Sequence, residues 1–150
     1  MDRLYAGFGK STVDSTKSLV TRILIPEAGP GEGSGYARLE QRKALALPMV
    51  CVAAFLGIRD GMVERCRIAM APVGVGPVRA IEAERFLIGK AAEKEVFSEA
   101  GRLALKNANP RDSLIRGSKR YREEVLPVMV ERALSEALSD AEGREKEVEQ

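Results

Sequence analysis

The chain has 150 residues, of which 45% are hydrophobic and 31% are charged, and its formal net charge is +2. This composition is typical of a globular domain with one hydrophobic core. The small net charge gives no indication of a nucleic-acid partner. No apolar run approaches the roughly 18 residues of a membrane span, and the first residues contain no apolar signal region. We therefore expect a cytoplasmic protein without a membrane span.

The sequence contains no His and only two Cys, Cys51 and Cys66. The lack of His excludes His-based acid–base catalysis and the activation of a nucleophile by His. A structural zinc site usually needs four Cys or His ligands, so it is excluded as well. The segment GFGKST, residues 7–12, resembles a shortened phosphate-binding loop, but its first Gly is too close to the Lys. No catalytic residue or metal ligand is therefore indicated.

Two strands are predicted before residue 44. Residues 18–26 alternate in character and stop at Pro26, as a strand would. Residues 27–35 are rich in Gly, which favours a flexible connection. Residues 36–43 alternate again and predict a second strand with an unusually polar face, which must meet water or a partner. That face consists of Tyr36, Arg38, Glu40 and Arg42.

A hairpin is predicted next. Residues 49–57 are continuously apolar, which favours a central strand covered on both faces. Asp60 and Gly61 are typical of a two-residue hairpin turn. Residues 62–72 form the return strand, and its alternation turns Cys66, Ile68 and Met70 inward.

The hairpin also predicts the state of the cysteines. If Asp60 and Gly61 form the turn, the numbers of paired residues sum to 121, so Cys51 faces Met70 and Cys66 faces Phe55. The two Cys then lie four residues apart along the ladder, roughly 13 Å at ~3.3 Å per residue. A disulfide needs Cα atoms within about 7 Å. We expect two free, mostly buried thiols.

The second half of the chain changes to a helical period. A first helix is expected to begin at Pro77 and end near Gly89, with an apolar stripe that includes Ala80, Ala83 and Leu87. A second helix is expected within residues 92–107. Its stripe has the spacing i, i+1, i+4, i+7, i+8 and consists of Val96, Phe97, Ala100, Leu103 and Ala104.

A third helix is expected from Ile115 to Leu138, with Pro127 kinking or splitting it. The charged residues 139–150 are expected to fray. Strands first and helices second indicate the α+β class. We expect a two-layer sandwich in which an antiparallel sheet of three or four strands is followed by three helices packed on one face.

Four segments in this order resemble one known family. They are LYAGFGKSTV with LVTRILIP, GYARLEQRKALALPMVCVAAFL, CRIAMAPVGVGPVRAIEAERFLIGK and IRGSKRYREEVLPVMVERAL. Together they are similar to the C-terminal domain of the FAD-binding medium subunit of molybdenum hydroxylases. This group contains carbon monoxide dehydrogenase, xanthine dehydrogenase and 4-hydroxybenzoyl-CoA reductase. The resemblance covers about residues 4–138, and PVRAIEAE and RGSKRYR are its most telling parts.

The resemblance implies a role in electron transfer. In these enzymes a molybdenum cofactor subunit acts on the substrate, and electrons pass through [2Fe-2S] clusters to FAD and then to an external acceptor. The resemblance implies that this chain is a component of the FAD-binding subunit, without catalysis of its own. Its implied partners are flavin-binding domains or a flavin-binding subunit, the [2Fe-2S] subunit and the molybdenum cofactor subunit. A homo-oligomer is a further possibility, and nucleic acid is not an expected partner.

The domain organisation departs from the family. The two flavin-binding domains that come first in the family have no counterpart here, and residues 1–17 are similar to the end of the second one. We expect residues 1–17 to form an N-terminal arm, residues 18–138 the domain, and residues 139–150 a charged flexible tail. FAD is expected only as part of a complete subunit or complex, and none is expected to bind tightly to this chain alone.

The resemblance implies three contacts with the flavin. Tyr36 matches an aromatic position near the isoalloxazine ring, Arg38 aligns close to a Lys that reaches the flavin, and Val20 matches an apolar residue at the ring edge. Ala46 stands where many members carry an Asp. The alternative is that the Tyr36 strand is an exposed edge whose charges prevent aggregation.

Residues 116–122, RGSKRYR, carry four basic side chains in seven positions. With the resemblance, we expect a helix start that Arg116 and Tyr121 anchor against the sheet or a neighbouring domain. A solvated helix face is a second interpretation. A site for nucleic acid or phosphate is the least favoured, because the basic stretch is short and Glu123 and Glu124 follow at once.

Two functions from different classes remain. The first is the flavin-subunit component described above, and it predicts exposed apolar surface near Tyr36 and the N-terminal arm. The alternative is a free-standing protein–protein interaction module, or a self-associating one, that has lost the flavin role.

Overall fold

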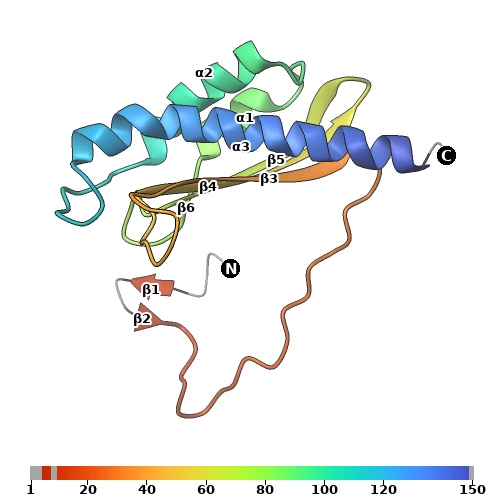
Figure 1. Ribbon diagram of the computed structural model, residues 1–150. Helices are drawn as coiled ribbons and strands as arrows, with labels where there is room; N and C mark the ends of the chain where they lie inside the picture. The colour runs from red at the N-terminus through yellow and green to blue at the C-terminus, as the bar shows by residue number, and fades with distance from the viewer. Residues whose placement is uncertain (1–4, 8–9, 149–150) are drawn as a thin grey trace.

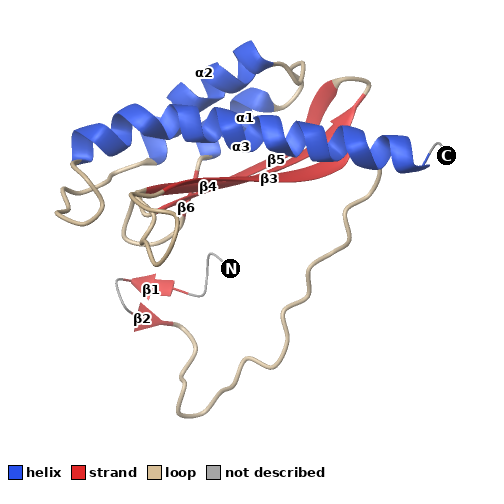
Figure 2. Ribbon diagram, in the orientation of Figure 1, coloured by secondary structure: helices blue, strands red, loops and turns tan. Residues whose placement is uncertain are grey.

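One antiparallel sheet and three helices form two layers in the computed structural model, which describes residues 5–7 and 10–148 (Figure 1). The sheet has the strand order β3-β4-β5-β6. Its elements are β3 (Glu32–Leu39), β4 (Val50–Arg59), β5 (Met62–Ala71) and β6 (Val78–Arg79). The helices are α1 (Ile81–Leu87), α2 (Lys94–Ala104), the short 3-10 helix η2 (Leu105–Asn107) and α3 (Lys119–Val148). The described helices cover one face of the sheet (Figure 2), so the predicted α+β sandwich is confirmed.

The predicted hairpin is confirmed, but its register is not. Asp60 and Gly61, both with positive φ, form the turn between β4 and β5. Arg59 pairs with Met62 as expected, and a bulge at Gly57/Ile58 then shifts the ladder by one residue. Such a bulge places one additional residue on one strand, and the local alternation of side chains does not reveal it.

The shifted register changes the neighbours of both cysteines. Cys51 pairs with Ala71 rather than Met70, and Cys66 pairs with Leu56 rather than Phe55. Both thiols are free, as predicted, with Cys66 buried and Cys51 half-buried.

Residues 18–26 do not form the predicted strand. They run as an exposed segment without regular structure after a separate small ladder of β1 (Tyr5–Gly7) and β2 (Lys10–Ser11). A strand needs a partner with unpaired backbone groups. The outer edge of β3 cannot serve, because Asp140 and Glu136 of α3 accept hydrogen bonds from its Ser34 and Tyr36 amides.

The Gly-rich connection predicted for residues 27–35 is in part strand, because β3 begins at Glu32. A Cβ atom at Gly33 would lie 2.2 Å from the Ala137 carbonyl oxygen of α3, and one at Gly35 would lie 2.1 Å from the Ala133 carbonyl oxygen. The two Gly residues therefore let the α3 backbone lie against the sheet edge. They serve close packing rather than flexibility.

The prediction that β4 is covered on both faces is wrong. Val50, Val52, Ala54 and Leu56 face the helices and are buried, whereas Ala53 on the other face is exposed. An apolar run is therefore compatible with one covered face, since on the open face Ala53 is small and the ring of Phe55 is covered in part by Arg65.

Three helix boundaries differ from prediction. Residues 78–79 form β6, and α1 starts at Ile81 rather than at Pro77. The third helix starts at Lys119 rather than Ile115 and continues to Val148, beyond the predicted end at Leu138. The turn after Leu138 has packing partners, because Asp140 bonds β3 and Ala141 is buried.

Pro127 does not split α3. A Cβ atom at Gly101 of α2 would lie 2.5 Å from the Pro127 carbonyl oxygen, so α2 and α3 pack closely at this point. The buried stripe of the predicted second helix is confirmed by Phe97, Ala100 and Ala104. No helix in the described part of the chain is long and apolar enough to span a membrane.

Candidate functional site

The face of the sheet opposite the helices is the first candidate site. Alternation along β3 turns Gly33, Gly35 and Ala37 toward α3, and it turns Tyr36 and Arg38 to the open face. Strand pairing places Tyr36 beside Ala53, and Ala53 beside Ala69. Since both Ala side chains are small and exposed, Tyr36 stands above a shallow apolar row. The predicted grouping of Tyr36 and Arg38 on one face is confirmed, but β3 ends at Leu39, so Glu40 and Arg42 lie beyond the strand and the predicted strand over residues 36–43 is wrong in its second half.

Tyr36 is 53% exposed, which is high for an aromatic side chain. Partial burial of the phenol raises its pKa, the nearby Cys51 thiol adds to this effect, and Arg38 opposes it. Strand pairing explains the contact, because Cys51 lies opposite Arg38 on the neighbouring strand. Cys51 is thus a member of the site that sequence reasoning considered only as a packing residue.

Arg38 is held by the loop that follows its strand. Its Nη2 donates to the Ala46 carbonyl oxygen over 2.7 Å, and its Nε lies 2.6 Å from a Glu40 carboxylate oxygen. Arg42 similarly donates to the Leu45 carbonyl oxygen over 2.9 Å. These bonds fold residues 40–48 back toward the open face and leave Leu45 96% exposed at the tip.

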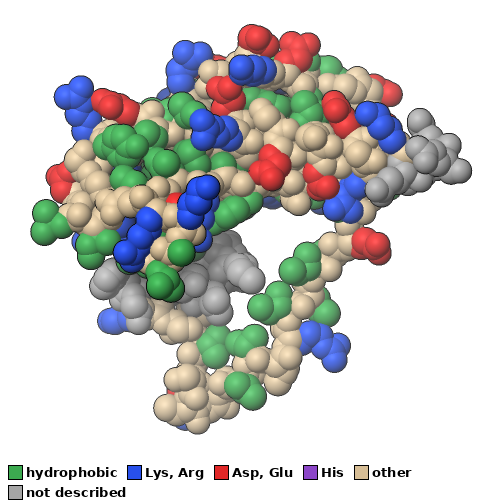
Figure 3. All heavy atoms as spheres, in the orientation of Figure 1, with side chains coloured by type: hydrophobic (Ala, Val, Ile, Leu, Met, Phe, Trp, Pro, Cys, Tyr) green, Lys and Arg blue, Asp and Glu red, His purple; other side chains and the backbone are tan. Residues whose placement is uncertain are grey.

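The structure does not bring Val20 into this group. Val20 is 60% exposed and lies in the extended segment that leaves the body of the domain (Figure 1). Apolar side chains follow one another along this segment (Figure 3). They are Leu19, Val20, Ile23, Leu24 and Ile25, and each is at least 60% exposed. We name these five residues the apolar segment.

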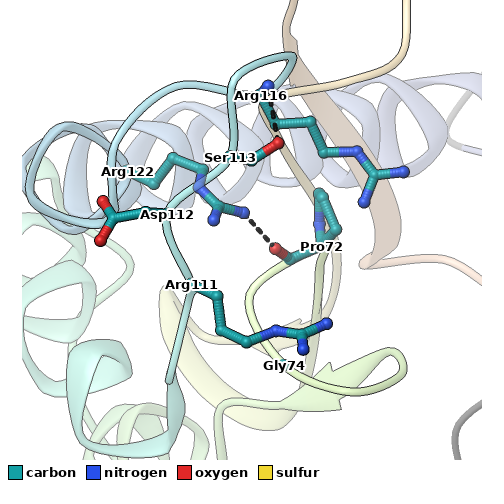
Figure 4. A pocket seen from close by; sticks show the side chains of 7 residues that line it. All are labelled: Pro72, Gly74, Arg111, Asp112, Ser113, Arg116 and Arg122. Atoms are coloured by element: carbon teal, nitrogen blue, oxygen red, sulfur yellow. Dashed lines mark hydrogen bonds between the residues drawn. The ribbon is translucent and has the colours of Figure 1, made fainter.

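A second candidate site lies where α3 begins. A cavity of about 240 Å³ opens there between the β5–β6 loop and residues 111–116 (Figure 4). Its lining includes Pro72, Arg111, Asp112, Ser113, Arg116 and Arg122. The predicted anchors Arg116 and Tyr121 are half-buried and 42% exposed respectively.

Arg122 is the residue that anchors the helix, at 3% exposure. Its Nη1 donates to the Pro72 carbonyl oxygen over 2.8 Å. The sequence contains a signal for this burial, since Arg122 precedes Leu126 by four positions and Met129 by seven, on the same buried stripe. The interpretation of RGSKRYR as a solvated face is therefore wrong for Arg122.

Among the described residues, no group of three or more His, Cys, Asp or Glu could hold a metal ion. The Gly residues of the PGEGSG segment also do not form a cradle for phosphate. A Cβ atom at Gly31 would lie 2.5 Å from the Ile58 carbonyl oxygen, and Gly33 and Gly35 contact α3.

Comparison with known proteins identifies the family. The family of the CO dehydrogenase flavoprotein C-terminal domain matches residues 36–137. A putative xanthine dehydrogenase FAD-binding subunit of Escherichia coli (strain K12) is 24% identical over 140 residues, which are 93% of this chain and 48% of that protein. The carbon monoxide dehydrogenase medium chain of Afipia carboxidovorans is 31% identical over 123 residues, 82% of this chain and 42% of that protein. The chain therefore spans about half the length of the curated relatives it matches.

Solved structures show the same fold. A Cu,Mo-CO dehydrogenase in its cyanide-inactivated form matches with a TM-score of 0.82 and 29% identity, over 93% of this chain and 48% of the other. A carbon monoxide dehydrogenase of Hydrogenophaga pseudoflava matches with a TM-score of 0.80 and 26% identity, over 93% of this chain and 47% of the other. The match to the family covers more than half of the residues and the fold agrees along nearly the whole chain, so this chain belongs to the CO dehydrogenase flavoprotein C-terminal domain family.

Proposed function

We propose that this chain acts as the C-terminal domain of the FAD-binding subunit of a molybdenum hydroxylase, in the cytoplasm. In this role it supports electron transfer from the molybdenum cofactor and [2Fe-2S] clusters to FAD and performs no catalysis of its own. Its partners would be flavin-binding domains or a flavin-binding subunit, the [2Fe-2S] subunit and the molybdenum subunit. The arm at residues 1–17 and the apolar segment would contact the flavin-binding part.

The observation that carries this proposal is the exposed Tyr36 on the open face of the sheet. A half-exposed aromatic ring beside two small Ala side chains offers a flat surface to a ring system. The apolar segment adds further unburied apolar side chains to the same chain. Contiguous exposed apolar surface is typical of an interaction site.

The residues on the open face fit the isoalloxazine ring of FAD, and the Gly-rich segment beside them does not fit its pyrophosphate. Tyr36 could contact the isoalloxazine ring, and the guanidinium of Arg38 could donate a hydrogen bond at its edge with a donor that Ala46 and Glu40 leave free. The Gly residues of the PGEGSG segment are not free to cradle the pyrophosphate, because they pack against backbone. When bound, FAD supplies the centre that accepts electrons and passes them on. This partial fit supports FAD binding in a complete subunit or complex and not tight binding to this chain alone.

The test is purification of the tagged chain from its native host, followed by the mass and the visible spectrum of what co-purifies. We expect larger chains with flavin and iron–sulfur absorbance. The variant Tyr36→Ala should reduce the recovered flavin at least severalfold. Tyr121→Ala is the matched control, because Tyr121 is similarly exposed but lies on α3. A colourless monomer from the wild-type chain would refute the proposal.

The alternative is a free-standing interaction module that binds another protein or a second copy of itself. The apolar segment favours it as well, since exposed apolar side chains can bury each other in a homo-oligomer. Light scattering of the purified chain distinguishes the two. A stable homo-oligomer without flavin, abolished by Ile23→Asp and Ile25→Asp together, would favour the alternative.

A further inference from the structure

The cavity at the start of α3 is lined by an excess of positive charge, which the packing of the domain does not explain. Arg111, Arg116 and Arg122 place three guanidinium groups in its wall, and Asp112 is the single carboxylate there. Figure 4 shows Pro72 between Arg111 and Arg116, which lie on the loop before α3, and Arg122, which lies at the start of α3. The side chains of the wall thus sum to a charge of about +2.

The charges of these arginines are not balanced inside the protein. Within the part of the chain that the structure describes, none of the three forms an ion pair, whereas Arg120 and Lys119 beside them do. The single carboxylate, Asp112, offsets part of this charge at Arg122, and its Oδ1 accepts a hydrogen bond from the Lys119 amide over 2.8 Å. The first turn of the 30-residue helix α3 lies at the same place, and the N-terminus of a helix carries a partial positive charge.

Arg122 is an independent sign of a missing ligand. The residue is only 3% exposed, and its Nε is buried without a hydrogen-bond partner among the described residues. Buried guanidinium groups are normally paired with an anion, because an unpaired buried charge is costly. Burial lowers the pKa of Arg122, the neighbouring Arg116 and Arg111 lower it further, and Asp112 opposes them in part. The cations are therefore crowded, and an anion in the cavity would relieve that repulsion.

The size of the cavity restricts the class of ligand. A water molecule takes about 30 Å³ of liquid volume, so the cavity of about 240 Å³ has room for more than one water. It is smaller than the roughly 300–1,000 Å³ of sites for drug-sized ligands. A small oxyanion fits these limits, and a whole dinucleotide does not. The planar fork of Arg matches the oxygen pairs of phosphate and makes two hydrogen bonds to it.

We propose that this cavity binds a phosphate-like oxyanion, held by Arg111 and Arg116 at the rim and by the charge of Arg122 at the inner wall. Phosphate is the least favoured interpretation of RGSKRYR from the sequence alone. The buried Arg122 and the additional cation Arg111 in the same cavity now favour it. The site does not depend on the flavin role, because it lies at the start of α3 and shares no residue with the Tyr36 face.

The test is a titration of the full 150-residue chain with inorganic phosphate at constant ionic strength, followed by calorimetry and by the amide signals of residues 111–122 in NMR spectra. We expect saturable binding. Arg111→Gln and Arg116→Gln should each weaken phosphate binding about tenfold, since each removes a charge-assisted pair of hydrogen bonds. Arg120→Gln is the matched control, as Arg120 lies outside the cavity and is paired with Glu124. It should change the affinity less than twofold.

A further variant should strengthen binding. Asp112→Asn removes the one negative charge of the wall and keeps an oxygen that can accept the Lys119 amide, so phosphate should bind severalfold tighter. Adenosine monophosphate identifies the source of the anion: tighter binding than phosphate indicates a nucleotide phosphoryl group, and equal or weaker binding indicates free phosphate. The proposal is overturned if wild-type binding does not saturate, or if Arg120→Gln weakens it as much as Arg116→Gln does.

Discussion

Arg122 shows how one polar residue can hold a helix start in place. Its aliphatic part lies on the buried stripe of α3, and its Nη1 donates to the Pro72 carbonyl oxygen. Arg122→Ala would remove this packing and leave the carbonyl without that donor. We expect a loss of about 2–3 kcal/mol in the free energy of unfolding. Urea denaturation followed by circular dichroism measures it.

Arg120 provides the control for this change. It lies in the same turn, is exposed, and forms an i,i+4 pair with Glu124. Surface pairs of this kind contribute little to stability. Arg120→Ala should therefore reduce the free energy of unfolding far less than Arg122→Ala, and equal losses would contradict the anchoring role.

The two cysteines should differ in reactivity. Burial raises the pKa of the Cys66 thiol to about 12, and the charge of Glu84 adds to this effect. At pH 8 the thiolate of Cys66 is then about one part in ten thousand. We expect iodoacetamide to modify the half-buried Cys51 first and to leave Cys66 unmodified until urea unfolds the chain. Mass spectrometry of the native protein checks this, and equal labelling rates would contradict it.

The contact between β3 and α3 depends on Gly at the sheet edge. In Gly35→Ala the new Cβ atom would lie 2.1 Å from the Ala133 carbonyl oxygen, so the helix must move. We expect the free energy of unfolding to fall by about 1–3 kcal/mol. Gly143→Ala is the control within α3, because nothing lies within 4 Å of its Cβ position. It should raise the free energy of unfolding by up to about 1 kcal/mol. A gain in both variants would refute the close approach.

The same contact predicts a pH dependence. The hydrogen bond from the Ser34 amide lowers the pKa of Asp140 below the ordinary value for an aspartate, and Arg144 contributes in the same direction. A carboxyl group with a lowered pKa in the folded state stabilises that state above about pH 4, and this stabilisation is lost as the pH falls further. Asp140→Asn should therefore narrow the difference in urea midpoint between pH 6 and pH 3. An unchanged difference would show that the bond contributes nothing to stability.

At the scale of the whole molecule, the sequence predicts local structure better than contacts between distant segments. The turn at Asp60 and Gly61 and the stripe of α2 follow from neighbouring residues alone, and both are confirmed. The prediction of a strand at residues 18–26 is wrong, because the alternation of side chains does not show whether a sheet edge is free to pair. The start of β3 was missed because Gly33 and Gly35 serve a helix about 100 residues later in the chain. For the sites, alternation predicts the grouping of Tyr36 and Arg38, while the cavity lies between residues 72–74 and 111–122, two stretches that only the fold brings together.

The proposed interface with flavin-binding domains makes a prediction for the whole molecule. Residues 19–28 form no hydrogen bond within the described part of the chain, so their backbone is accessible to a protease. Trypsin should cleave after Arg22 while the bonds after Arg65 and Arg67 stay intact, because those residues lie in the paired strand β5. Peptide mass spectrometry over a time course measures both rates. If the apolar segment packs on flavin-binding domains, cleavage after Arg22 should slow at least tenfold in the complex purified from the host, and cleavage at Lys146 on the far end of α3 should not change. Equal cleavage after Arg22 in the free chain and in the complex would mean that the segment is not part of the interface, and the contact would then have to be sought on the Tyr36 face alone.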